Sequence, residues 1–426
     1  MRWIAGLITV LSLAVVPLAA RTEVVDQVWA GHPVAFALAA SDKHLFVGYY
    51  GADRRLTVAE RDISGGAWRY TRLDTSVGWD SHNYIAMAID SVERLHVAAN
   101  MHVSPLTYYT AAKPDDAESL RRVPVLIDPT RELRMTYPVF LKDRAGRLIF
   151  RYRDGGSGNG NDIYTVCDGR TWAPLLNVPL TDGEGKRNAY PVGPVVGPDG
   201  QFHLTWVWRE TPDAATNHDL SYARSADLSH WQKADGTPLV LPMTYESAEI
   251  VDPVPVGGGM INNNTLIGFD ADARPLIAYH KYDAAGHTQI YVARFEEDHW
   301  RVVQASDWTG YRWEFGGNGS LIFEVTLKAA YARGDEVIVP VTRQGVATEL
   351  HLRATDLSRV AETPAPPSRF AADIKGVAIP ADMQLNQVEL DAGGHHYLLA
   401  WATLPQNRDR PRDVVPPPVP LMLFEK

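Results

Sequence analysis

Apolar and polar residues alternate along most of the chain in short runs that end at Gly, Asp or Asn. Alternation with period two, interrupted by turn residues, is typical of antiparallel β-hairpins. One hairpin pattern recurs seven times, with an apolar strand, a Gly/Asp turn and a second strand rich in aromatic residues, at residues 35–50, 84–100, 137–153, 190–209, 264–280, 325–341 and 386–402. No substantial helix is visible in the pattern, so it predicts an all-β protein.

The spacing of these seven copies predicts the architecture. They recur about every 58 residues, which is close to the repeat length of propeller blades once loops are added. Between them lie further strand-like runs, the outer strands of the same blades, which end at Trp68, Trp172, Trp231 and Trp300. We therefore expect residues 21–426 to form a single seven-bladed β-propeller with no linker between domains.

The two ends of the chain predict how the ring closes. Residues 23–29 precede the first copy without a hairpin of their own, and residues 420–426 form the last strand-like run. The economical arrangement places the N-terminal strand at the outer edge of the last blade, because a ring closed in this way has no open sheet edge. The Pro-rich segment 410–420 is expected to be an ordered surface loop.

The first twenty residues differ from the rest. Arg2 precedes an apolar run that ends at Pro17 and small residues, which is the pattern of a secretory signal peptide cleaved near Ala20. The run is short for a membrane span, and no later stretch reaches about 18 uninterrupted apolar residues. We therefore expect residues 1–20 to be a signal peptide and the protein to be secreted or periplasmic, with no membrane partner. The alternative is an uncleaved N-terminal anchor.

Composition and charge exclude several classes of protein. Of the 426 residues, 45% are hydrophobic and 22% charged, which is ordinary for a globular chain. The formal net charge of -10 argues against a nucleic-acid partner, because phosphate binding needs a basic surface. The single cysteine, Cys167, excludes an intrachain disulfide framework and a cysteine-clustered zinc site. We expect a monomer.

Residues able to carry chemistry stand at matched positions of the second, third and fourth copies. The strand starts hold His82, Asn83, Tyr137 and Tyr190, and the ends of the second strands hold His102, Arg153, Trp208 and Arg209. In a propeller these positions gather at one mouth of the ring. The sequence therefore predicts a mouth lined by cationic and phenolic groups on an acidic protein, which would attract an anion.

Each of these residues also has an ordinary structural alternative. A lone His on a strand is usually packed, and Tyr137 and Tyr190 precede Pro, so that each could simply begin a strand. Trp208 is a candidate platform for stacking on a sugar, although most propeller tryptophans pack between blades. Three further histidines lie inside strands and are expected to be structural, namely His96, His203 and His280.

The set as a whole fits proton abstraction next to a carboxylate. In a uronic acid the C5 hydrogen becomes removable when cations neutralise the carboxylate and donors hold the developing enolate. Arg153 with a neighbouring His suits that task. A base must then take the C5 proton and an acid must protonate the departing O4. His is suited to neutral pH and a nearby cation favours a phenolate, so His and Tyr can perform β-elimination without a carboxylate pair.

Residues 79–109, 136–164 and 188–225 resemble the BNR-4 type propeller proteins, a group that includes ulvan lyases and lyases that remove rhamnose from glucuronate in gum arabic. The resemblance implies that His82 and Tyr137 form the acid/base pair and that Arg153 and His102 neutralise the uronate. Which of His82 and Tyr137 abstracts the proton stays open. Tyr190 matches a further substrate-side tyrosine. Several members carry a structural metal ion, calcium or zinc, whose ligands here remain unknown.

Three functions compete. The first is a secreted polysaccharide lyase that cleaves rhamnose–glucuronate linkages of an acidic polysaccharide or oligosaccharide, leaves an unsaturated uronate and needs no cofactor for catalysis. The second is a non-catalytic carbohydrate-binding propeller. The third is a sialidase-like glycoside hydrolase, which needs a Tyr nucleophile, an acid/base carboxylate and converging arginines. No Asp or Glu stands out to activate a Tyr, so the lyase is the expected function, with Asn83, Tyr190, Trp208 and Arg209 as substrate-binding residues.

Overall fold

The computed structural model describes residues 19–426, so the predicted signal peptide lies almost wholly outside the described residues. Nearly all regular structure in this range is β-strand, and its one α-helix is the short α1 (Ala371–Ile374). The prediction of an almost entirely β protein is therefore confirmed. Within residues 19–426, no helix is long and apolar enough to span a membrane.

The first half of the chain folds into four antiparallel units. The first unit contains β2 (Ala37–Ala40), β3 (His44–Tyr50), β4 (Arg55–Asp62) and β5 (Arg69–Ser76). The second contains β6 (Ile85–Ile89), β7 (Leu95–Ala99), β9 (Tyr108–Ala111) and β10 (Leu120–Arg122). The third contains β8 (His102–Ser104), β11 (Met135–Lys142), β12 (Leu148–Gly156), β13 (Asn159–Cys167) and β14 (Trp172–Pro174). The fourth contains β15 (Asn188–Val196), β16 (Phe202–Arg209), β17 (Asn217–Ser225), β18 (Trp231–Gln232) and β19 (Glu249–Asp252).

The second half adds three units. The fifth contains β20 (Leu266–Phe269), β21 (Pro275–Tyr282), β22 (Thr288–Glu296) and β23 (His299–Gln304). The sixth contains β24 (Val325–Leu327), β25 (Tyr331–Arg333), β26 (Glu336–Arg343), β27 (Val346–Arg353) and β28 (Arg359–Pro364). One parallel pairing, Phe269 with Tyr331, joins the fifth and sixth units into a single hydrogen-bonded sheet. The seventh contains β1 (Arg21–Val28), β29 (Gln384–Ala392), β30 (His395–Thr403) and β31 (Val419–Glu425).

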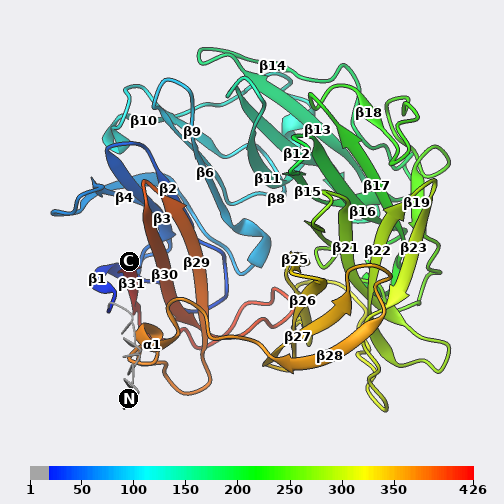
Figure 1. Ribbon diagram of the computed structural model, residues 1–426. Helices are drawn as coiled ribbons and strands as arrows, with labels where there is room; N and C mark the ends of the chain where they lie inside the picture. Colours follow the sequence, from blue (N-terminus) through cyan, green and yellow to red (C-terminus); the bar gives the residue numbers. More distant parts are fainter. Residues whose placement is uncertain (1–18) are drawn as a thin grey trace, which may run out of the picture.

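The units follow one another in chain order around a common centre (Figure 1). Each of the seven predicted hairpins forms the antiparallel strand pair that opens its unit. In the sixth unit the inner strand is broken into β24 and β25, which both pair with β26. The arrangement is propeller-like, and the hairpins were readable because short apolar runs are separated by Gly and Asp turn residues.

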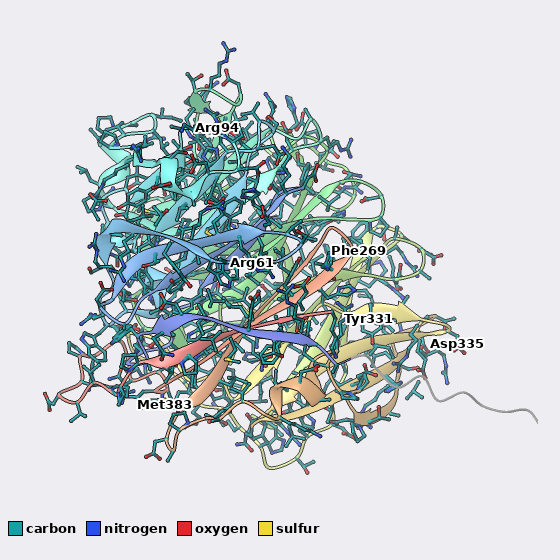
Figure 2. All side chains as sticks on the ribbon, turned by 90° about the vertical axis from the view of Figure 1, so that its left-hand side faces the viewer. Arg61, Arg94, Phe269, Tyr331, Asp335 and Met383 are labelled. Carbon is teal, nitrogen blue, oxygen red and sulfur yellow. The ribbon has the colours of Figure 1, made fainter. Side chains whose placement is uncertain are left out.

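The two ends of the chain meet in the seventh unit. β1 pairs with β31 from Arg21 opposite Glu425 to Val28 opposite Val419, which confirms the predicted edge position of the N-terminal strand. The buried Arg61 of β4, labelled in Figure 2, forms ion pairs with Glu23 (3.0 Å) and Glu425 (3.1 Å). Ion pairs therefore join the first and seventh units.

Apolar packing strengthens the same junction. The ring of Phe36, just before β2, stacks on Trp401 of β30 with centroids 4.3 Å apart. Buried residues of the first unit and of β30 and β31 belong to one continuous apolar cluster. Burying such aromatic surface contributes on the order of 2 kcal/mol for each large side chain.

Three strand histidines are structural, as expected. His96 is buried, with Nδ1 2.5 Å from the Tyr108 hydroxyl and Nε2 3.1 Å from Asp90. His203 repeats this arrangement in the fourth unit, 2.6 Å from the Tyr222 hydroxyl and 3.0 Å from Asp199. The third, His280, is buried against the rings of Trp313 and Phe315.

Candidate active site

A pocket of about 420 Å³ opens at the centre of the ring, where the starts of the inner strands meet. Four of the predicted site residues line it, namely His82, Tyr137, Tyr190 and Arg209. The second, third and fourth units contribute these side chains, as the matched positions in the sequence predicted. Tyr84, which the sequence analysis did not single out, also lines the pocket and donates a hydrogen bond to the Pro138 carbonyl (3.0 Å).

Two histidines meet because a short strand crosses between units. His82 lies in the 3-10 turn η1 (Ser81–Asn83) just before β6, and His102 begins β8. β8 leaves the second unit and pairs with β11 of the third, with His102 opposite Thr136. The two imidazoles stack with ring centroids 4.1 Å apart and an angle of 20° between their planes.

Asp80 holds both imidazoles, and the sequence analysis missed it. His82 Nδ1 lies 2.6 Å from Asp80 Oδ1, and His102 Nδ1 is hydrogen-bonded to Asp80 Oδ2. Burial alone would raise the pKa of Asp80, but the hydrogen bonds from His102 and His82 hold it well below its usual range. An ionised carboxylate can only accept hydrogen bonds, so the Nδ1 atoms of both histidines carry the hydrogen. Each Nε2 is then unprotonated and able to accept a proton.

Asp80 was missed because its type is common in turns. It caps η1 by accepting a hydrogen bond from the His82 backbone N–H at 2.9 Å, as an Asp before a short turn often does. The usable signal was the spacing Asp-x-His beside a second His at the next strand end.

Tyr137 is presented to the pocket by a β-bulge. The pairing of β11 with β12 shifts register between Thr136 and Val139, and Tyr137 adopts φ +59°, a left-handed conformation that is strained for a bulky residue. Such strain is commonly found at functional sites. The Tyr137 ring lies 5.6 Å from that of His82. Burial raises the pKa of the Tyr137 hydroxyl, and the neighbouring Tyr190 raises it further, against the lowering effects of Arg153 and Arg209.

Two guanidinium groups lie behind the tyrosines. Arg153 is only 5% exposed, and its Cζ lies 4.8 Å from the Tyr137 ring centre and 5.8 Å from that of Tyr190. Arg153 Nη1 and Arg209 Nη1 both donate to the Tyr190 hydroxyl, at 3.4 and 3.5 Å. Arg153 Nη2 is buried without a partner in the described part of the chain. Among residues 19–426, neither arginine has a carboxylate within 4.0 Å.

The resemblance implies that Arg153 neutralises the uronate carboxylate. In the structure Arg153 does not line the pocket itself but lies behind it, against the rings of Tyr137 and Tyr190. Strand position tells which end of the sheet a residue occupies, and packing of the neighbouring rings decides how deep it lies. Arg151, two residues earlier, does line the pocket, but its guanidinium is held by Asp162 at 2.8 Å.

Two predicted substrate contacts are not placed to touch a ligand in the pocket. Trp208 is fully buried, donates to Ser221 Oγ at 3.1 Å and packs edge-on against Trp206, so it has no face to offer a sugar. Asn83 is buried and does not line the pocket; its carbonyl accepts from the Tyr50 hydroxyl at 2.6 Å. Both side chains are buried in the packing between sheets and are not exposed to the pocket.

A metal ion fits poorly among these groups. In the described residues, Asp80, His82 and His102 form the one cluster of three side chains whose ligand atoms converge, within 4.8 Å of one another. Neighbouring ligand atoms around an ion bonded at about 2.1 Å stand about 3 Å or more apart. The Asp80–His82 separation of 2.6 Å is shorter. The three side chains are arranged as hydrogen-bond partners.

Comparisons with known proteins agree with the fold. A model of the BNR repeat-containing family (BNR_4) matches residues 44–308. The crystal structure of the polysaccharide lyase Uly1 superposes with a TM-score of 0.61 at 13% identity, covering 92% of this chain and 89% of that chain. A polysaccharide lyase PL25 ulvan lyase gives 0.60 at 15% identity, covering 89% and 93%. The same kind of lyase bound to -[GlcA(1-4)Rha3S]- gives 0.59. No curated protein matches the sequence significantly.

Proposed function

The chain belongs to the BNR repeat-containing family, and we propose that it is a polysaccharide lyase that cleaves a rhamnose–glucuronate linkage by β-elimination. Its fold is that of a BNR-type, lyase-like propeller protein. The observation that carries the proposal is the unbalanced charge at the pocket. Arg153 and Arg209 converge on the Tyr190 hydroxyl without a carboxylate of their own. Buried unpaired cations are costly, so an anion from the substrate completes the site.

The groups in the pocket divide the work of the reaction. The uronate carboxylate binds at the Tyr190 hydroxyl, which Arg153 and Arg209 polarise. His102 does not line the pocket and supports the site through the Asp80 carboxylate that it shares with His82. His82 Nε2 takes the C5 proton. The C5–H electron pair becomes the C4=C5 double bond, the C4–O4 bond breaks, and the Tyr137 hydroxyl protonates O4 on the departing sugar. Asp80 keeps the His82 ring oriented and stabilises the imidazolium that forms.

The structure favours His82 as the base and Tyr137 as the acid. Burial and the neighbouring Tyr190 raise the pKa of Tyr137, which keeps its proton in place at neutral pH. His82 carries its hydrogen on Nδ1 toward Asp80 and leaves Nε2 to accept another. In glucuronate the C5 hydrogen and O4 lie on the same ring face, which suits an acid and a base whose rings are 5.6 Å apart.

A panel of uronate polysaccharides, followed by the ultraviolet absorbance of the unsaturated uronate, tests the proposal. Ulvan and gum-arabic-type glycans should give absorbance and new reducing ends together, and His82→Ala or Tyr137→Phe should abolish both. New reducing ends without absorbance would indicate a hydrolase instead. Binding that persists in both variants, with no turnover by the parent protein, would indicate a sugar-binding propeller.

Several finer features are also proposed. The seven units close into a seven-bladed propeller, supported by the β1–β31 pairing and the Arg61 ion pairs. Residues 1–20 are removed as a signal peptide, and residues 21–426 act as a secreted or periplasmic monomer. Sequencing the mature N-terminus of the exported protein tests the cleavage; a chain that begins at Met1 would contradict it.

Catalysis is proposed to need no metal ion, because guanidinium and imidazole groups already supply the positive charge at the pocket. Any calcium or zinc would be structural. Dialysis against a chelator should therefore leave the initial rate of double-bond formation unchanged. Loss of activity that added calcium or zinc restores, without a change in the melting temperature, would contradict this.

A further inference from the structure

Two loops meet across the central pocket. We call residues 315–321 and residues 406–410 together the strap. The first segment lies between β23 and β24, and the second lies in the connection from β30 to β31. Arg408 Nη1 joins them by donating to the carbonyls of Gly316 (2.6 Å) and Asn318 (3.3 Å). Gly319 packs so closely on Arg408 that a Cβ there would lie 2.5 Å from the Arg408 carbonyl oxygen, at a φ of +81°.

The strap is anchored at both sides of the pocket. On the side of the fourth unit, the Gly317 N–H donates to Asp213 at 2.5 Å, and the Ala214 N–H donates to the Gly317 carbonyl at 3.0 Å. On the side of the second unit, Asp409 accepts from the backbone N–H of Ser81 at 3.1 Å. The strap therefore spans from one wall of the mouth to the other.

Asp409 is the central connection of the strap. One of its oxygens accepts from the Ser320 N–H (2.6 Å), and the other accepts from Ser81 and lies 3.1 Å from His32 Nε2. Its Oδ2 is also 3.9 Å from His82 Nδ1. The same carboxylate thus links both loops to the turn that carries His82. Each of these hydrogen bonds to a charged group is worth more than a neutral one.

The strap divides the central space. The 420 Å³ pocket is bounded on this side by Gly319, Ser320, Leu321, Phe323 and Gln406, facing His82 and Tyr137. Beyond the strap lies a second hollow of about 300 Å³, bounded by residues that include Pro33, Asn386 and Trp401. The two hollows share only Ser81 and Gln406. The first, at about 420 Å³, has the size of a small-molecule pocket, at the low end of about 300–1,000 Å³.

We propose that the strap is the specificity-determining element of the site and confines cleavage to the end of a uronate-containing chain. This inference rests on the proposed lyase function. The uronate takes the place beside Tyr190, and the sugar on its O4 side lies against Ser320 and Gln406, where the strap leaves no room for a further residue. A chain that continued past this sugar would have to cross the Asp409–Ser320–Ser81 hydrogen bonds.

The size distribution of early products tests the inference. A long rhamnose–glucuronate polysaccharide is treated with the full mature protein, and ultraviolet absorbance, viscosity and product mass are followed together. We expect single saturated sugars to be released from the O4 side, and absorbance to rise on the polymer itself, whose new chain end carries the unsaturated uronate, while the viscosity of the polymer stays almost constant. Unsaturated oligosaccharides of intermediate length at early times, with a rapid fall in viscosity, would overturn the inference and leave the lyase function standing. Absence of any double bond would overturn both.

A matched pair of variants tests whether the strap is responsible. Arg408→Ala removes the two side-chain hydrogen bonds by which Arg408 joins the loops, and Arg410→Ala removes another exposed arginine two residues away. We expect Arg408→Ala to raise the share of intermediate-length products at least several-fold, and Arg410→Ala to match the parent. Asp409→Ala should act in the same direction as Arg408→Ala if it folds. Unchanged product sizes in a folded Arg408→Ala protein would contradict the assignment.

Discussion

At the scale of single residues, the site depends on one carboxylate that serves two imidazoles. Asp80 fixes the hydrogen on Nδ1 of both His82 and His102, so both rings present Nε2 at the same time. The stacked rings are 4.1 Å apart, and loss of the carboxylate would leave two adjacent imidazoles without a common anchor. Asp80 is therefore a positioning residue for His82, the proposed base, and for His102.

Asp80→Asn should lower kcat by about 100-fold or more while changing KM little, because general acid/base catalysis typically contributes 10²–10⁴-fold. The amide nearly matches the carboxylate in shape but can accept from only one imidazole. Initial rates of double-bond formation measure the effect. The control is Asp168→Asn, which replaces a turn carboxylate that accepts from Thr171, away from the pocket. A variant with the parent's kcat would contradict the role of Asp80.

The pH profile distinguishes the acid from the base. Burial raises the pKa of Tyr137 above its usual value of about 10, so the hydroxyl stays protonated across the neutral range. If Tyr137 is the acid, kcat/KM should show no alkaline decline below about pH 10. If it acted instead as a phenolate base, kcat/KM would rise continuously with pH up to that point. Tyr137→Phe should reduce kcat/KM by about 10²-fold or more.

The sequence indicated which residues lie near the pocket, but it did not indicate how deeply each of them is buried. The matched strand positions indicated His82, His102, Tyr137 and Tyr190, because blade geometry brings such positions to one mouth. Asp80 escaped notice since Asp before a turn is usually a cap. Trp208 was misjudged because an aromatic residue at a strand end gives no sign of whether the next sheet covers it, and here it is fully buried.

At the scale of elements, short irregular segments position the side chains proposed to act in catalysis. β8 carries His102 from the second unit to the third, and the bulge in β11 turns Tyr137 into the pocket. Neither feature could be predicted from the sequence. A three-residue strand is too short to show a period-two alternation, and a bulge interrupts the alternation of the strand that contains it. The hairpins around them were predicted correctly, since their alternation extends over many residues.

The strap also leads to a prediction about stability, through Asp409. Hydrogen bonds from His32, Ser81 and Ser320 outweigh burial and lower the pKa of Asp409 from 3.8 to about 2. Because the folded pKa is depressed, the contribution is complete above about pH 4 and is lost as pH falls toward 2. It amounts to about 2 kcal/mol.

Asp409→Asn should therefore reduce the free energy of unfolding at pH 6, and the difference from the parent should shrink between pH 4 and pH 2. Urea unfolding at several pH values measures this. Asp42→Asn, which changes an exposed carboxylate just before β3, serves as the control. A difference that is independent of pH would contradict the account of Asp409.

At the scale of the whole molecule, the proposed closure of the propeller depends on the junction of the two ends of the chain. The β1–β31 pairing, the Phe36–Trp401 stack and the Arg61 ion pairs all join the first and seventh units. The strand pairing could be predicted because the N-terminal run lacked a partner of its own. The role of Arg61 could not, since its partners Glu23 and Glu425 lie 38 and 364 residues away in the sequence.

Arg61→Ala should destabilise the protein by about 3 kcal/mol, because removing one partner of a buried ion-pair cluster leaves its carboxylates uncompensated. The change in denaturation midpoint measures the effect. Arg72→Ala, on the exposed strand β5 of the same unit, should change the stability by less than about 0.5 kcal/mol. Equal midpoints for the two variants would contradict a closing role for Arg61.

The central claim is that four pocket side chains from neighbouring units act on one sugar acid, namely His82, Tyr137, Tyr190 and Arg209. Its most direct test is ultraviolet absorbance during digestion of a glucuronate–rhamnose polysaccharide by the parent protein and by His82→Ala. The account predicts that the parent forms an unsaturated uronate with each bond cleaved, and that the variant forms none while retaining its fold. Cleavage without a double bond, or a fully active His82→Ala protein, would contradict it.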